Sequence, residues 1–357
     1  MAERSSRKTK TWVIVIIALL GFVALFSAVS LFLVKTLYDS NFPQYDRPQF
    51  SGFLTFDDMT NYPYTTVQFE SGMNKLTGYI FGEQNDKGLV VISHGSGSGA
   101  ERYLAEIVYF VDHGWRVFAY DNTGSYTSEG ASTVGLSQSL LDLRAALNYV
   151  KNNESLRSLP LMLYGHSWGG YAVTAILNEN HEISAVASIA GYNTPLGLFY
   201  EQGKSQAGFF GTIAYPYEWL YQRLLFGNDA GIAAVDGINS SGTPVMIIHG
   251  TADDLILYNG ASIMAQKDAI TNPNGVYVTR SEAGQDGHSS LLRSREALEY
   301  SAAKNQECKA ISDSFGGNIP QDVRAAWYAG LDKWKTSELD SGLMDQIGSF
   351  FESSLLQ

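Results

Sequence analysis

One serine of this sequence stands in a setting that would make its hydroxyl a nucleophile. Ser167 lies at the centre of a Gly-x-Ser-x-Gly pentapeptide, between Gly165 and Gly169. The apolar run at 159–163 has the length of a strand, and residues 171–177 are typical of a helix. A serine on so sharp a strand-to-helix turn is held in a strained conformation with its hydroxyl exposed. The glycines are expected because side chains at both positions would collide across the turn.

Acyl transfer from such a serine needs a base, an acid that orients the base, and N–H donors for the oxyanion. The chain offers an acid and a base after two later apolar runs of strand length. Asp253 and Asp254 follow the run at 244–248, and His288 follows the run at 275–279. The order serine, aspartate, histidine is one of the chain orders in which such residues occur. These spacings predict a catalytic triad at the ends of three strands.

Three segments carry a family resemblance. Gly-His-Ser-Trp-Gly-Gly, His-Gly-Thr-Ala-Asp-Asp and Gly-His resemble the triad segments of the α/β-hydrolase superfamily, over about residues 65–300 and the last helix. The resemblance implies a serine hydrolase in which Ser167 is the nucleophile, Asp253 the acid and His288 the base. Asp254 and Asp286 remain alternatives for the acid. The serine motif also resembles that of oligopeptidase-type hydrolases, so peptidase activity is the alternative to ester cleavage.

The resemblance also implies where the oxyanion is held. The loop at 93–99 follows an apolar strand, where the family places half of its oxyanion hole, and the backbone N–H groups of Ser96 and Trp168 form the natural pair. The turn at 121–128 is similar to the family's Asp-x-Arg-Gly-x-Gly-x-Ser turn, but Thr123 and Tyr126 replace its arginine and second glycine. His94 and His166, which lie beside the motifs, are expected to be structural or to support the site, and His249 is expected to end a strand.

The remaining pattern predicts an α/β fold. An alternating hairpin around Ser71 and Gly72 precedes apolar runs of strand length that alternate with helix-length segments. Continuous apolar strands are buried on both faces, which indicates a mostly parallel twisted sheet with helices on each side. We therefore expect one α/β-hydrolase domain at 65–357. The aromatic-rich segment at about 194–242 interrupts the alternation and is expected to form a helical cap insertion.

The first residues predict a membrane anchor. Residues 11–34 contain no charged side chain, and as a helix they would span about 36 Å, enough for a hydrocarbon core of about 30 Å. The tail at 1–10 carries four basic side chains and one acidic one, which favours a cytoplasmic N-terminus and a domain outside the membrane. A cleaved signal peptide is the alternative. The lone cysteine, Cys308, cannot form an internal disulfide, which favours a bacterial surface protein. Residues 35–64 lack periodicity and are expected to be a stalk.

Composition and motifs narrow the classes of ligand that this chain is expected to bind. The net charge is −12 at pH 7, and no basic patch favours nucleic acid. No His-Glu-x-x-His or Cys-x-x-Cys motif occurs, so neither metal nor other cofactor is expected. The expected partners are a small acyl substrate or a short peptide, and the membrane. Two other classes are weaker alternatives: a dinucleotide-binding protein, because Gly95-x-Gly97-x-x-Ala100 is followed by Asp121, and a non-catalytic surface binding protein.

Overall fold

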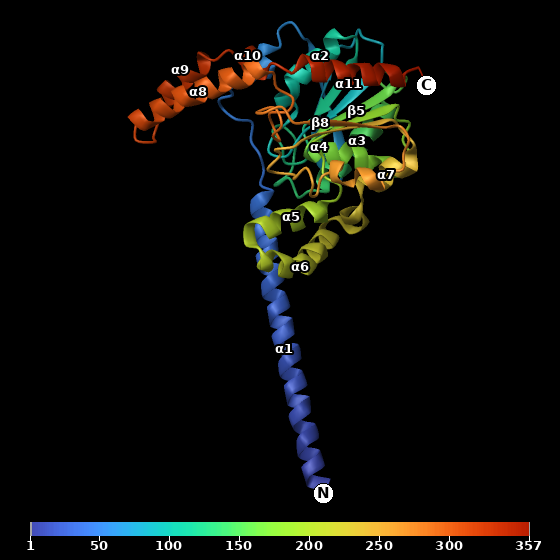
Figure 1. Ribbon diagram of the computed structural model, residues 1–357, viewed down its shortest axis with the longest axis vertical. Coiled ribbons are helices and arrows are strands. Elements are labelled where there is room, and N and C mark those ends of the chain that lie inside the picture. Colours follow the sequence, from blue (N-terminus) through green and yellow to red (C-terminus); the bar gives the residue numbers. More distant parts are fainter. Residues whose placement is uncertain (1, 357) are drawn as a thin grey trace.

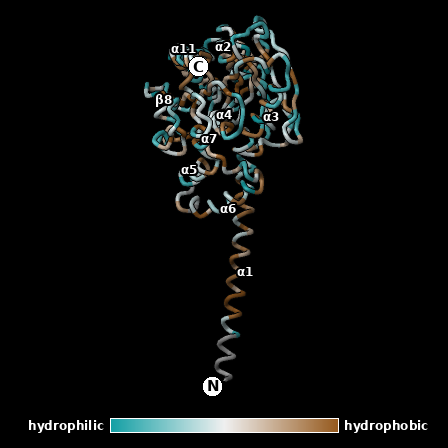
Figure 2. Tube along the Cα trace, turned by 90° about the vertical axis from the view of Figure 1, so that its right-hand side faces the viewer, coloured by the Kyte–Doolittle hydropathy of each residue, from teal (hydrophilic) through white to brown (hydrophobic). Residues whose placement is uncertain are grey.

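A computed structural model describes residues 2–356 of the chain, apart from the side chains of residues 2–9, Ala207 and Phe210. One long helix, α1 (Ala2–Asn41), projects from a domain that contains all the strands (Figure 1). The apolar residues of α1 extend away from the domain, and the N-terminus lies far from the C-terminus (Figure 2). The stretch Lys10–Asn41 is long and apolar enough to cross a membrane, by length and composition.

The domain is built on a sheet of eight strands in the order β1-β2-β4-β3-β5-β6-β7-β8. The first two strands form an antiparallel hairpin, β2 pairs antiparallel with β4, and the other neighbours are parallel. This confirms the predicted hairpin and mostly parallel sheet. The strands are β1 (Tyr64–Ser71), β2 (Asn74–Phe81), β3 (Leu89–Ser93), β4 (Arg116–Tyr120), β5 (Leu161–His166), β6 (Ala185–Ile189), β7 (Val245–Gly250) and β8 (Gly275–Arg280).

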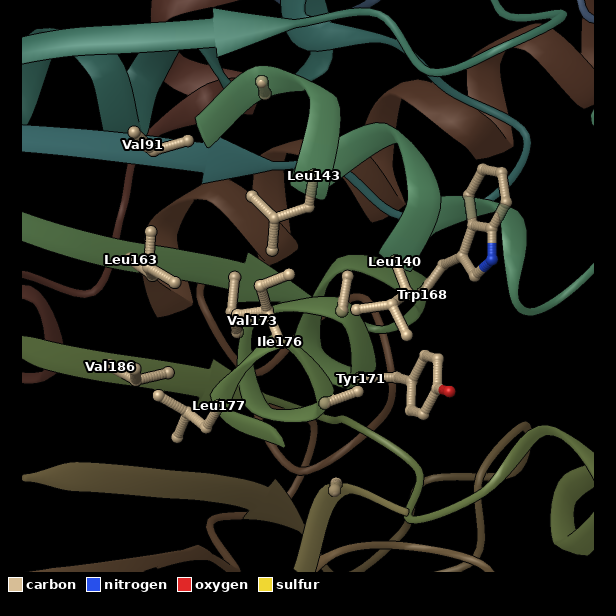
Figure 3. Packing of buried hydrophobic residues seen from close by; sticks show 14 of the residues in the cluster. Val91, Leu140, Leu143, Leu163, Trp168, Tyr171, Val173, Ile176, Leu177 and Val186 are labelled. Atoms are coloured by element: carbon tan, nitrogen blue, oxygen red, sulfur yellow. The ribbon is translucent and has the colours of Figure 1, made fainter. Parts of the chain in front are cut away.

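Helices cover both faces of the sheet because successive side chains of its central strands point to opposite faces. On one face Val91, Leu163 and Val186 pack against four helices: α3 (Gln138–Asn152), α4 (Trp168–Ala175), η3 (Ile176–Asn178) and α7 (Ala234–Ser241). Figure 3 shows this packing for α3, α4 and η3. On the other face Val90 and Met162 share a core with α2 (Leu104–Asp112) and α11 (Ser341–Ser354). The fold thus has three layers, as the apolar strands predicted.

The segment at 35–64 differs from the expected stalk. Helix α1 continues to Asn41, and the chain then runs along the domain instead of hanging free. Phe42 is buried, and Pro43 and Tyr45 form isolated bridges with the loop that follows β4. The Arg47 guanidinium pairs with the Glu101 carboxylate. These contacts are not visible in the local sequence because partners such as Phe199 and Glu101 lie far along the chain. We call residues 42–62, which include η1 (Phe56–Asp58), the tether.

The expected cap is helical but shorter than predicted. Helices α5 (Pro195–Ala207) and α6 (Phe209–Phe226), followed by η4 (Gly227–Gly231), lie beside the domain-proximal part of α1 (Figure 1). Helix α7 was predicted as part of the cap. It belongs instead to the domain, since Ala234 and Ile238 are buried in the core beside α4. We use the name cap for α5 and α6 only.

The C-terminal region contains the last helices. Helices α8 (Arg295–Ser314) and α9 (Gln321–Ala329) form an arm that extends from the domain on the side away from the cap (Figure 1). Helix α10 (Lys333–Ser337) returns the chain to the domain, where α11 packs on the sheet. Short 3-10 segments, η2 (Ala100–Tyr103) and η5 (Met264–Ala269), complete the fold. Positions 1 and 357 of the predicted domain ranges lie outside the described residues.

Candidate active site

The turn between β5 and α4 places Ser167 in a strained conformation. Its φ of 58° and ψ of −114° lie where residues other than glycine are rarely found. A Cβ atom at Gly165 would overlap the backbone of Gly169, and one at Gly169 would overlap the carbonyl of Ser93 at the end of β3. Both positions therefore require glycine. The first overlap crosses the turn, as the sequence predicted, whereas the second is with a neighbouring strand.

Three predicted residues meet at this turn. The Ser167 Oγ lies 2.8 Å from His288 Nε2, and His288 Nδ1 lies 2.8 Å from an Asp253 carboxylate oxygen. Because a carboxylate can only accept, Nδ1 carries the proton, which leaves Nε2 free to accept the serine O–H. Asp254 is exposed, and the Asp286 carboxylate accepts a bond from another hydroxyl, so neither takes the position of the acid. The arrangement can transfer a proton from serine to histidine.

Asp253 is buried and accepts several hydrogen bonds. One oxygen accepts the backbone N–H groups of Leu255, at 3.0 Å, and Ile256, at 2.8 Å. The other oxygen accepts from His288 and lies 3.1 Å from His249 Nε2. Burial alone would raise the pKa of Asp253, but the hydrogen bonds from His249 and His288 outweigh it and hold this pKa well below its ordinary value. The carboxylate is therefore ionised and fixed in orientation.

A second histidine supports the base from the backbone side. His166 Nε2 donates to the backbone oxygen of His288 at 2.9 Å, so its Nδ1 accepts the Tyr103 O–H at 2.8 Å. The same Tyr103 oxygen accepts the N–H of Gly95 at 2.9 Å. Burial, and to a smaller degree His288, lowers the pKa of His166 to about 3, so the ring is neutral. This chain of bonds connects the loop after β3 to the loop that carries His288.

The two predicted oxyanion donors flank the nucleophile. Trp168 is the first residue of α4, where a backbone N–H has no partner within the helix. Ser96 follows Gly95, whose added Cβ atom would lie 3.4 Å from the Cβ of Ser167. The loop therefore passes directly beside the serine. Its course is fixed by His94, which donates from Nδ1 to the Gly95 carbonyl and accepts the Asn122 N–H at Nε2.

Comparisons with known proteins agree with this fold. A family model described as serine aminopeptidase, S33, matches residues 84–197. No curated protein matches the sequence. The esterase Pf2001 of Pyrococcus furiosus is similar in one crystal form with a TM-score of 0.52 and 21% identity, over 70% of this chain and 92% of that chain. A second crystal form gives 0.52 and 20%, over 75% and 98%. The chain therefore has the α/β-hydrolase fold that these structures share.

The chain departs from the α/β-hydrolase pattern in the turn after β4, and the structure gives the reason that this is tolerated. Tyr126, which stands where the second glycine is usual, adopts a φ of 46°. Its N–H donates to the Tyr45 carbonyl at 2.7 Å, so the tether holds the loop in this conformation. Asp121 accepts the N–H of Ala100 at 2.8 Å and the hydroxyl of Thr127 at 2.8 Å. The Asp121 carboxylate is thus occupied by bonds within the domain, which disfavours the dinucleotide-binding alternative.

The cap is fastened to the loop that carries Asp253. Helix α5 begins at Thr194, whose hydroxyl accepts the N–H of Gly197. Farther along α5, the Glu201 carboxylate accepts the N–H groups of Leu257, at 3.1 Å, and Ala261, at 2.7 Å. These bonds hold α5 against the residues that follow Asp253, and the cap therefore stands next to the catalytic edge of the sheet.

Two site residues were not predicted for the roles they take. His249 was expected only to end a strand, yet it contacts Asp253, and Tyr103 was not singled out, yet it binds His166. His166, which was expected to have a structural or supporting role, binds the backbone of His288. The only sequence signal was their position next to the motifs. Among residues 2–356, no three or more His, Cys, Asp or Glu side chains are grouped to hold a metal ion.

Proposed function

We propose that this chain is a serine hydrolase that cleaves an ester or related acyl bond through an acyl-enzyme intermediate. The observation that carries the proposal is the unbroken series of hydrogen bonds from Ser167 Oγ through the His288 ring to Asp253, with both distances at 2.8 Å. The depressed pKa of Asp253, held by His249 and His288 against the effect of burial, supports a charged acid beside the base.

The proposed reaction proceeds in two halves. His288 Nε2 takes the proton of Ser167 Oγ while this oxygen attacks the acyl carbon, and Asp253 stabilises the resulting imidazolium. The backbone N–H groups of Ser96 and Trp168 hold the oxyanion. His288 then gives the proton to the leaving group. In the second half His288 removes a proton from water, which attacks the acyl-serine, and the carboxylic acid leaves. Thioesters and acceptors other than water fit the same steps.

We also propose that α1 anchors the enzyme in a membrane with the catalytic domain outside the cytoplasm. Support comes from the long apolar stretch of α1, whose large side chains are exposed along most of its length. The basic residues before it favour a cytoplasmic N-terminus.

A fluorophosphonate probe tests the catalytic proposal on the full-length protein in detergent. The probe should label the wild type, and Ser167→Ala should lose the label and lower kcat by about a thousandfold or more with little change in KM. The matched control Ser314→Ala removes an exposed hydroxyl on the C-terminal arm and should keep both. A folded wild type that takes no label would refute the proposal.

Peptidase activity is the second candidate, since the matching family model is described as serine aminopeptidase. A panel of p-nitrophenyl esters of graded chain length, run beside aminoacyl p-nitroanilides, separates the two candidates. Ester cleavage with no release of nitroaniline supports the first proposal. A higher kcat/KM on the anilides would favour the second, because the same triad would then serve an amide bond.

A further inference from the structure

Helix α6 carries an exposed apolar face at helical spacing. Its members stand at positions i, i+3, i+7 and i+11 and share one side of the helix: Ile213, Pro216, Leu220 and Leu224. We call these four residues the stripe. Leu224 is 70% exposed, and neither charged residue of the helix, Glu218 or Arg223, belongs to the stripe. A face of this kind is normally covered in a soluble protein.

The stripe faces away from the domain. On the opposite side of α6, Gly211 packs so closely on α5 that an added Cβ would overlap the backbone of Gly203, and Gln222 is buried. Figure 1 shows that α6 lies farther from the domain than α5, toward the N-terminal part of α1. Neither α5 nor the domain therefore covers the stripe.

Contacts with α1 fix the position of α6 along the axis of α1, which we call its level. The Tyr217 hydroxyl lies 3.1 Å from Ser27 Oγ, and the rings of Tyr217 and Phe26 are 6.2 Å apart. Farther along, the Tyr221 hydroxyl donates to Asp39 at 3.1 Å. Four residues at helical spacing lie on the face of α1 that is turned to the cap, and their side chains are less exposed the closer they lie to the domain. These residues are Ser27, Leu31, Val34 and Tyr38. Two of these four, Val34 and Tyr38, are fully buried.

This level coincides with the outer boundary of a bilayer. The distance from Lys10, the last basic residue before the apolar stretch, to Ser27 is about 26 Å along a helix. A hydrocarbon core is about 30 Å thick, so Tyr217 lies just inside its outer edge. Two further aromatic side chains of α6, Tyr215 and Trp219, are 37% and 48% exposed. Tyrosine and tryptophan are the residues that gather at membrane interfaces.

We infer that α6 lies in the outer lipid interface beside α1, with the stripe among the lipids, and that the site draws a membrane-resident acyl ester from that leaflet. The substrate part rests on the proposed serine hydrolase function. Helix α5 links α6 to the acid loop through Glu201, and beside that contact Leu255 and Leu257 are 52% and 45% exposed. Apolar side chains therefore stand at both the membrane level and the edge of the site.

Depth measurement tests the location without relying on activity. In a Cys308→Ser background, spin labels are placed on Leu220→Cys, Leu224→Cys and, as a control, Ser314→Cys on the arm, and the full chain is inserted in phosphatidylcholine–phosphatidylglycerol nanodiscs. Labels at 220 and 224 should relax preferentially with oxygen, as lipid-facing sites do, and the label at 314 with a water-soluble nickel complex. Relaxation by nickel at 220 and 224 would overturn the inference, as would shielding from both reagents, which indicates a protein partner.

Charge substitution tests the substrate class. Leu220→Glu/Leu224→Glu should hydrolyse a nanodisc-embedded long-chain p-nitrophenyl ester about tenfold or more slowly than wild type, because interfacial charges oppose burial of the stripe. The control Ser314→Glu/Phe315→Glu adds the same charges on the arm and should retain the wild-type rate. Fluorophosphonate labelling of all three proteins reports separately on the proposed function. Labelling with equal hydrolysis rates would reject the membrane substrate, whereas an unlabelled wild type would reject the serine hydrolase itself.

Discussion

At the scale of single residues, Asp253 is shared by two imidazoles. His288 binds one of its oxygens at 2.8 Å, and His249 Nε2 lies 3.1 Å from the same oxygen and 2.9 Å from the carbonyl of Ile256. Because a carbonyl only accepts, the His249 nitrogen carries a proton and points it at both oxygens. His249 therefore acts through Asp253, as a positioning residue that keeps the carboxylate aimed at the base.

Replacing this second imidazole tests the positioning role. His249→Phe keeps a ring of similar volume but removes the donor, and a hydrogen bond to a charged group contributes about 1.5–3 kcal/mol. We expect kcat to fall about tenfold to a hundredfold, with KM little changed, because the bond orients the catalytic groups and does not touch substrate. His113→Phe, at an exposed helix end, is the control. A rise in KM with kcat unchanged would show that His249 serves another purpose.

Two other buried histidines make stability depend on pH. Burial lowers the pKa of His94 to about 4 and that of His166 to about 3. Below pH 6.5 the unfolded chain binds a proton at each histidine while the folded protein does not, so acidification favours unfolding. Each histidine should lower the free energy of unfolding by about 1.4 kcal/mol for every pH unit between pH 6 and pH 5.

The contribution is measured as a difference, because buried carboxyls such as Asp121 and Asp142 have raised pKa values, also caused by burial, and act in the opposite direction. Urea unfolding of the detergent-solubilised full chain is followed at both pH values for wild type, His94→Asn and His166→Asn. In each variant, the free energy of unfolding should depend less on pH than in the wild type, by the contribution of the histidine that was replaced. A variant with the wild-type dependence would mean that its histidine is protonated in the folded protein.

At the scale of elements, the central strands and the nucleophile turn could be predicted from local sequence. Strands such as β3 and β5 are buried on both faces, and this demands continuous apolar runs that are visible in the chain. Ser167, Asp253 and His288 could be proposed because their motifs adjoin such runs. The tether could not, since its residue Phe42 packs on Phe199, whose position depends on the whole fold. The same holds for the bond between His249 and Asp253.

The close contact between α4 and β3 yields a prediction about the turn itself. A methyl group at Gly169 would overlap the backbone of Ser93, which cannot move without breaking the sheet. Gly169→Ala should therefore destabilise the protein by about 3 kcal/mol or more and abolish probe labelling of Ser167. Gly342→Ala in α11 places its methyl group at an ordinary 3.5 Å from Asp340 and should leave unfolding and labelling near wild type. Equal behaviour of the two variants would contradict the packing argument.

At the scale of the whole molecule, helix α1 and the edge of the sheet that carries Ser167 form one structure. Tyr38 of α1 packs between Phe199 of α5 and Tyr221 of α6, with ring centroids 5.0 and 5.2 Å apart. The tether then binds the turn after β4 through Tyr45. The catalytic edge of the sheet is thereby held beside the same end of α1 as the cap. A membrane around α1 would fix the distance of the site from the bilayer as well as the side on which it works.

The side of the membrane can be decided with the single cysteine. Cys308 lies partly exposed on α8, far from the basic N-terminal tail. If basic residues keep the N-terminus in the cytoplasm, a membrane-impermeant maleimide should label Cys308 on intact cells. In a Cys308→Ser background, Ser6→Cys should react only after permeabilisation. The reverse pattern would place the catalytic domain in the cytoplasm, and release of labelled protein from washed membranes would show that α1 is cleaved.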